Sequence, residues 1–205
     1  MKKMVFTKTQ IRSQILLGII LCACNLGVMF LQRLNPVPLY MDTLFTITAA
    51  FFGPISGCIC ATLFHLTCAL FIDSNKTAFI WSICSYTIVL IIRMYIKKRS
   101  KIERLDILLL IFIIAIIISI EGALIFTILN ILSTYTELSQ VRLMYGFLSR
   151  NNLPTFVAAL LPRVPVNILD KGICVSLGYL SYKGLSNFLS SKKGKSDKQK
   201  EKDAQ

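Results

Sequence analysis

Three long stretches without charged side chains constrain the fold of this chain most strongly. Residues 13–32 and 43–72 carry no Asp, Glu, Lys or Arg, and residues 107–136 carry only Glu121. A helix needs about 20 predominantly apolar residues to cross a bilayer. Only 16% of the 205 residues are charged, against roughly 25% in soluble domains. The sequence therefore predicts a polytopic membrane protein and excludes soluble enzymes, nucleic-acid-binding domains and secreted disulfide scaffolds.

The basic residues gather at three places along the chain. The formal net charge is +13, and Lys and Arg concentrate before residue 13, between residues 93 and 104, and after residue 182. In a soluble protein such a charge suggests a nucleic-acid partner, but in a membrane protein it marks the cytoplasmic loops. We therefore expect a multi-pass protein of the cell membrane, embedded in the lipid bilayer with both termini cytoplasmic and no nucleic-acid partner.

Hydropathy and helix-breaking residues predict an all-α bundle of six transmembrane helices within residues 1–190. The Gly53-Pro54 pair divides the second uncharged stretch into two helices, of which the first is short and begins at Asp42 as a possible cap. Residues 134–153 are more polar and are expected to be functional or partly structured. Residues 191–205 are too polar to bury and are predicted to be a disordered cytoplasmic tail. The six expected helices are 11–32, 42–52, 53–72, 78–96, 105–132 and 152–189.

Few residues suggest metal or cofactor chemistry. The chain has no Gly-rich phosphate loop of the ATPase type, and His65 is its single histidine. The seven cysteines are interpreted as small packing residues. We therefore predict no metal site, no cofactor and no catalytic residues, with His65 packed or hydrogen-bonded within its helix.

Charged groups inside the apolar stretches are the stronger functional signal, because they are costly in hydrocarbon and usually face a bundle interior. Glu121 lies in the middle of a predicted helix. On the last helix, Arg163, Asn167, Asp170 and Lys171 fall within about 100° of arc. One interpretation is an interhelical ion-pair network, such as Glu121 with Arg163 or Lys171. The other is a polar pocket for a ligand, which stays open for Arg163 and Asn167, whereas a structural pair is favoured for Asp170 and Lys171.

Further candidates lie near the predicted outer surface and on the first helix. Aromatic side chains there form interfacial belts or stack on a flat ligand. Ala23 and Gly27 are small residues at helical spacing, which allow a close contact within the bundle or with another subunit. The remaining predicted substrate-binding residues are Tyr40, Asp42, Trp81, Tyr86 and Asn130.

Two segments resemble the substrate-binding (S) components of energy-coupling-factor (ECF) vitamin transporters. They are PLYMDTLFT at residues 38–46 and FGPISG at residues 52–57. The stretch RVPVN at residues 163–167, the length and the six expected helices fit the same family. The resemblance covers about residues 10–190.

The resemblance implies a function in uptake rather than an enzyme. An S component binds a vitamin or related micronutrient from outside, between the outer halves of its last three helices, and docks on a transmembrane coupling protein with two cytoplasmic ATPases. Arg163 would then bond an anionic group of the ligand, Glu121 or Asn167 its polar edge, and Trp81 or Tyr86 its ring. The family's Ala-x-x-x-Ala docking motif would correspond to Ala23 and Gly27, with glycine in place of the second alanine.

Other classes of function remain open at this point. A ligand-sensing membrane domain of the same fold is one, although the 205 residues contain no kinase or cyclase module. A membrane-embedded lipid-modifying enzyme is another, and it would need paired acidic residues at a membrane face. A purely structural assembly subunit is the third.

Overall fold

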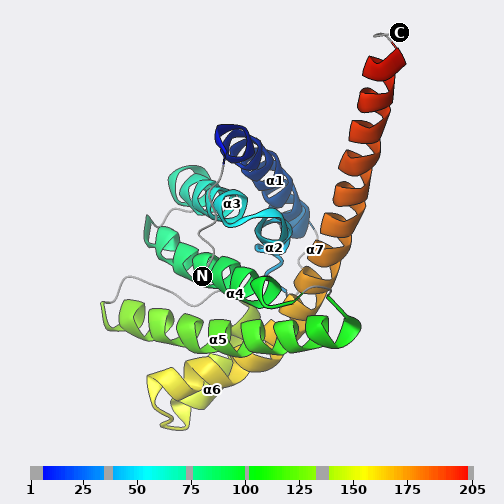
Figure 1. The fold of residues 1–205 in the computed structure, drawn as a ribbon. Coiled ribbons are helices and arrows are strands. Elements are labelled where there is room, and N and C mark those ends of the chain that lie inside the picture. Colours follow the sequence, from blue (N-terminus) through cyan, green and yellow to red (C-terminus); the bar gives the residue numbers. More distant parts are fainter. Residues whose placement is uncertain (1–6, 35–38, 73–75, 100–101, 133–138, 203–205) are drawn as a thin grey trace.

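The computed structural model describes residues 7–34, 39–72, 76–99, 102–132 and 139–202, and these residues form helices and short connections without a β-strand (Figure 1). The helical fold class predicted from the sequence is confirmed for these residues. A π-helical turn, η1, extends α3, and a 3-10 turn, η2, precedes α4. The elements are α1 (Lys8–Leu34), α2 (Leu44–Phe52), α3 (Pro54–Thr67), η1 (Cys68–Ile72), η2 (Lys76–Trp81), α4 (Ser82–Lys97), α5 (Arg104–Ile131), α6 (Ser139–Arg150) and α7 (Thr155–Lys202).

Among the residues that the structure describes, four helical segments are long and apolar enough to cross a membrane, which is compatible with a multi-pass membrane protein. They are Lys8–Gln32, Pro54–Ile72, Phe79–Lys97 and Arg104–Ile131. The two other predicted spans differ from these for separate reasons. Helix α2 has only 9 residues, or roughly 14 Å at 1.5 Å per residue, and α7 carries Arg163, Asp170 and Lys171 close together.

Helices α1, α2 and α3, which follow one another along the chain, alternate in direction. Gln14 of α1 packs against Gly53 at the start of α3, and the sulfur of Met29 lies 3.7 Å from that of Cys68 at the other end of α3. Helices α1 and α3 are therefore parallel, and α2 returns between them. Helix α7 runs antiparallel to α5, because Arg163 lies over Phe126 whereas Asn167, further along α7, bonds to Ser119.

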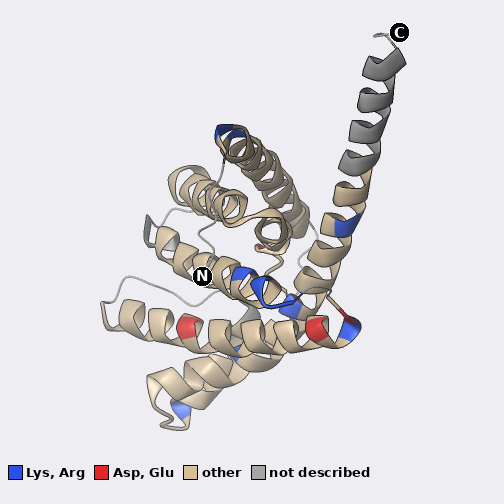
Figure 2. Ribbon diagram, viewed as in Figure 1, with Lys and Arg blue, Asp and Glu red and all other residues tan. Residues whose placement is uncertain are grey.

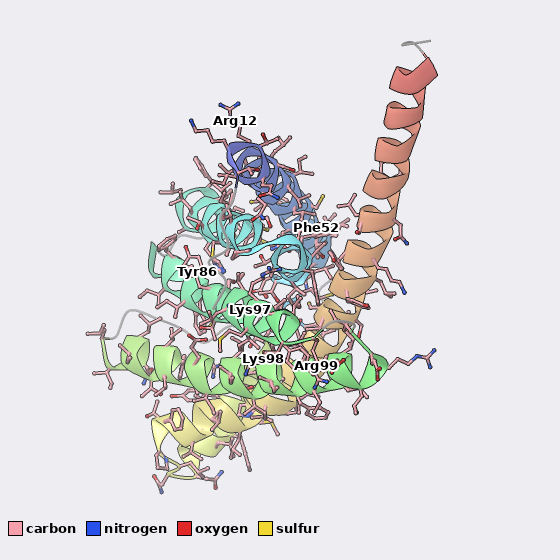
Figure 3. The ribbon with its side chains drawn as sticks, in the orientation of Figure 1. Arg12, Phe52, Tyr86, Lys97, Lys98 and Arg99 are labelled. Carbon is pink, nitrogen blue, oxygen red and sulfur yellow. The ribbon has the colours of Figure 1, made fainter. Side chains whose placement is uncertain are left out.

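Basic side chains mark one end of this bundle, which we call the basic end. In Figure 2 blue segments gather around the connection from α4 to α5, and Figure 3 shows Lys97, Lys98 and Arg99 there. Arg99 Nη2 lies 3.4 Å from Asp106 Oδ1, and Asp106 also accepts from the backbone N–H of Glu103 at 2.9 Å, which caps α5. The turn between α2 and α3 lies at this end, because Arg93 Nη1 donates to the Phe51 carbonyl at 3.2 Å.

The apolar core lies among α2, α4, α5 and α7. Ile47, Ile88, Ile114 and Val175, one from each of these helices, are completely buried in it. Gly57 of α3 lets α4 approach, since a Cβ there would lie 2.9 Å from the Val89 side chain. The short helix α2 is thus enclosed by the longer ones, although it contributes less than a full span.

Two helices extend through polar segments of the sequence. Residues 139–150 form α6, whose Val141 is only 1% exposed and whose Tyr145 packs edge-to-face on Phe126 at 4.9 Å. The backbone of α7 continues as a helix to Lys202, through most of the segment for which composition predicts disorder. Lys, Gln and Glu are good helix formers, so a helix that is already nucleated extends through them.

Candidate functional site

The polar stripe of α7 faces the bundle interior. Arg163, Asn167, Asp170 and Lys171 are each at most 4% exposed. Pro162 and Pro165 lie within α7 without ending it. Asp170 and Lys171 pair with each other, whereas Asn167 bonds to Ser119 of α5 and Arg163 donates to the Ala159 carbonyl of its own helix.

Lys171 and two carboxylates form an ion group deep in the bundle. The Lys171 Nζ atom lies 2.6 Å from Asp170 Oδ2 and 3.7 Å from Asp42 Oδ1. It also donates to Thr43 Oγ1 at 2.9 Å. Asp170 is completely buried, whereas the Asp42 side chain is 36% exposed. Asp42 was expected to cap α2, but the N-cap residue is Thr43, because the Asp42 carboxylate turns toward Lys171.

Residues 39–43, the inserted segment, run down into the bundle beside this group. Asp170 Oδ1 accepts from the Met41 N–H at 2.7 Å, and Gln32 Nε2 donates to the Leu39 carbonyl at 2.7 Å. Met41 has a φ of 44°, in the left-handed region, which costs energy for a residue other than glycine. Irregular backbone is tolerated at membrane depth only where protein covers it and satisfies its polar groups.

Asn25 of α1 completes the anchoring of the inserted segment. Its Nδ2 donates to the Asp42 carbonyl, and its Oδ1 accepts from the Phe45 N–H at 3.1 Å. One completely buried amide thus serves the free backbone groups at the start of α2. Helix α2 is short because it begins at this depth within the bundle.

Arg163 lies in an aromatic setting away from the basic end. Its Cζ is 5.0 Å from the Phe126 ring centroid, and Nη1 donates to the Ala159 carbonyl at 2.8 Å. A Cβ on Gly122 would lie 3.6 Å from Arg163 Nε and 3.5 Å from Trp81 Cζ3. The missing side chain of Gly122 therefore leaves room for both groups, and the predicted residues Trp81 and Arg163 flank one position of α5.

Asn167 and Glu121 each bond to a hydroxyl of a neighbouring helix. Asn167 Nδ2 donates to Ser119 Oγ at 2.9 Å. Glu121 Oε1 accepts from Thr87 Oγ1 at 2.9 Å. The suggested pair of Glu121 with Lys171 is wrong, because Asp42 and Asp170 occupy the Lys171 ammonium.

The structure does not bring all predicted site residues together. The Tyr86 hydroxyl lies 2.8 Å from that of Thr62 on α3, and Figure 3 shows Tyr86 on α4. Asn130 is exposed near the end of α5, and Tyr40 is half-buried in the inserted segment. Trp81 and Arg163 are therefore close to each other, whereas Tyr86 and Asn130 lie elsewhere.

The first-helix candidates face outward. Ala23 and Gly27 are both exposed, and a Cβ on Gly27 would meet nothing within 4 Å. This face of α1 is open to lipid or to another protein in the part of the chain that the structure describes.

His65 and five of the seven cysteines are buried, as expected for packing residues, whereas Cys24 and Cys58 are exposed. His65 Nε2 lies 2.8 Å from Ser85 Oγ, and all seven cysteines are free thiols. Among the residues with described positions, no group of three or more His, Cys, Asp and Glu is arranged to hold a metal ion.

Several residues that contact the candidate site residues or hold the inserted segment carry no mark in the sequence. Asn25, Thr43, Thr87, Ser119 and Gly122 are uncharged residues on four different elements. Only Asn25 gives a signal, because an amide in an otherwise apolar helix usually bonds to a neighbouring element. Comparisons with models of protein families, with curated proteins and with solved structures find no match to this chain.

Proposed function

We propose that the chain is the substrate-binding component of an ECF-type importer, which captures a small water-soluble vitamin or related nutrient from outside the cell. The observation that carries this proposal is that Arg163, a residue only 4% exposed, places its guanidinium beside Trp81 and Phe126. A buried guanidinium next to aromatic rings suits a ring-shaped ligand with an acceptor or anionic group.

In this proposal α2 and α7 complete six membrane segments, and the basic end faces the cytoplasm together with both termini. The positive-inside rule supports this orientation. Arg163 and Trp81 then lie toward the outer side, where the nutrient arrives, with Asn167 one turn from Arg163 along α7 and Glu121 next to Gly122 on α5. Tyr40, Asp42, Tyr86 and Asn130 remain secondary candidates for ligand contact.

ATP hydrolysis belongs to partner subunits in this proposal. The exposed face of α1 around Ala23 and Gly27 would dock on a transmembrane coupling protein, which in turn binds two cytoplasmic ATPases. The chain itself needs no cofactor for capture. An alternative role as a ligand sensor uses the same binding site but requires a separate signalling partner.

The proposal is tested by purifying the protein and identifying co-purifying small molecules by mass spectrometry, followed by calorimetric titration with B-group vitamins and biotin. We expect one ligand to bind wild type and the Arg150→Ala control, whose side chain is exposed on α6. Arg163→Ala should weaken binding at least tenfold, or about 1.4 kcal/mol. If wild type retains and binds no such molecule, the uptake function is refuted.

A further inference from the structure

One carboxylate oxygen of Glu121 has no hydrogen-bonding partner among the described residues. Oε1 accepts from Thr87, but Oε2 is buried and bonds to none of the residues whose side chains are described. The Cys84 thiol also interacts with the Glu121 carboxylate, but a thiol is only a weak donor. A buried acceptor left unsatisfied costs about 1–3 kcal/mol, and more when it is charged.

The charges around the candidate site do not balance. Away from the basic end, the described residues of this region include three carboxylates, of Asp42 (side chain 36% exposed), Glu121 and Asp170, against the two cations of Arg163 and Lys171. The formal sum of these five groups is −1. Lys171 contacts both Asp42 and Asp170, so its positive charge is already paired with these two carboxylates.

An added positive charge would therefore stabilise Glu121 more than it would stabilise Asp42 or Asp170. Uncompensated charges in a membrane interior are expensive and mark functional sites. Trp81 lies beside Gly122, the next residue along α5, and a tryptophan face also attracts cations. An amine or a cationic ring nitrogen would satisfy Oε2 and remove the charge deficit in one step.

We propose that the ligand of this site carries a positively charged nitrogen that pairs with Glu121 Oε2. The inference rests on the proposed binding function and specifies its substrate class, a cationic amine or cationic nitrogen heterocycle. Arg163 then donates to an acceptor group at another part of the same molecule. The ligand therefore places its cation on Glu121 and its acceptor on Arg163.

The test compares wild type with Glu121→Gln in detergent, by calorimetric titration with charged and uncharged probes. Thiamine and pyridoxamine supply cationic nitrogen, whereas riboflavin is neutral and biotin anionic. We expect wild type to bind a cationic probe at least tenfold more tightly than riboflavin or biotin, and Glu121→Gln to lose at least tenfold for that probe. Sodium and potassium chloride at equal ionic strength test whether an inorganic cation suffices.

A second measurement needs no ligand. Because Glu121→Gln removes an unpaired buried charge, it should raise the melting temperature of the ligand-free protein. Asp170→Asn is the matched control, since that carboxylate already has Lys171 and the Met41 N–H as partners, and it should lower the melting temperature. If the Glu121→Gln variant melts at or below the wild-type temperature, the inference that Oε2 is an unpaired buried charge is refuted.

The outcomes separate this inference from the function on which it rests. Equal or tighter binding of riboflavin or biotin, or unchanged cation binding by Glu121→Gln, overturns the cationic ligand and leaves the binding function intact. Stabilisation of wild type by sodium or potassium alone also overturns it, because an organic ligand is then not required. Failure of every organic probe to bind contradicts both proposals.

Discussion

The Asp170 carboxylate accepts a hydrogen bond from the backbone N–H of Met41 at 2.7 Å, across 129 positions of sequence. Its second oxygen lies 2.6 Å from Lys171 Nζ. One completely buried side chain of α7 therefore holds both a cation on its own helix and the segment that leads into α2. The depth at which α2 begins depends on this contact.

Asp170→Asn is expected to destabilise the protein strongly. The substitution removes the close partner of a buried ammonium and leaves Asp42, 3.7 Å away, as the remaining carboxylate. Breaking a buried ion pair on one side typically costs about 3–5 kcal/mol. Thermal unfolding in detergent, followed by intrinsic fluorescence, measures the change.

The double variant Asp170→Leu with Lys171→Met is the control for this prediction. Replacing a buried ion pair by apolar residues of similar size is often neutral or stabilising, so the double variant should recover part of the loss. Full recovery is not expected, because the Met41 N–H stays without its acceptor. A melting temperature of Asp170→Asn equal to that of wild type would show that the pair does not hold the bundle.

Gly57→Ala and Gly27→Ala form a matched pair of helix substitutions with opposite expected effects. A Cβ on Gly57 would lie 2.9 Å from Val89 and 3.2 Å from the Ala50 Cα, whereas one on Gly27 meets nothing within 4 Å. Overpacking costs about 1–3 kcal/mol, and replacing an unhindered helix glycine by alanine gains up to about 1 kcal/mol. Gly57→Ala should lower the melting temperature and Gly27→Ala should not. Equal effects would contradict the close approach of α3 and α4.

Gly122 is expected to control access to the candidate site through its size. Alanine there makes ordinary contacts with Trp81 and Arg163, at 3.5 and 3.6 Å, so Gly122→Ala should bind ligand nearly as wild type does. Gly122→Leu displaces one of the two groups and should weaken binding at least tenfold, or about 1.4 kcal/mol. Gly172→Leu on α7, where a Cβ has open space, is the control. If Gly122→Leu keeps the wild-type affinity, position 122 does not border the ligand-binding site.

Sequence patterning predicts the helical segments well, because charge and Gly-Pro breaks act locally. The limits expected for the fourth and fifth helices lie within a few residues of α4 with η2 and of α5. Helix α6 was not predicted as a helix, although Val141, Tyr145 and Leu148 recur at helical spacing. The high polarity of its surroundings outweighed that signal.

The partners within the site are harder to predict than the polar stripe itself. Periodicity places Arg163, Asn167, Asp170 and Lys171 on one face, but it does not say which segment that face meets. The inserted segment reaches Asp170 only because Asn25 satisfies the backbone around Asp42 and α2 begins deep in the bundle. Such contacts depend on tertiary packing between distant residues, which no local pattern encodes.

The exposed face of α1 provides the last prediction, which concerns partner binding. Ala23 and Gly27 are exposed, and Gly27 has open space where a side chain would begin, so Ala23→Trp and Gly27→Trp should fold and bind ligand as wild type does. Close helix packing in membranes requires small residues, and tryptophan should therefore abolish co-purification with the proposed coupling protein and ATPases. Gly172→Trp, also in open space but on α7, should leave co-purification intact. Co-purification that survives both α1 substitutions would place the docking surface on another helix.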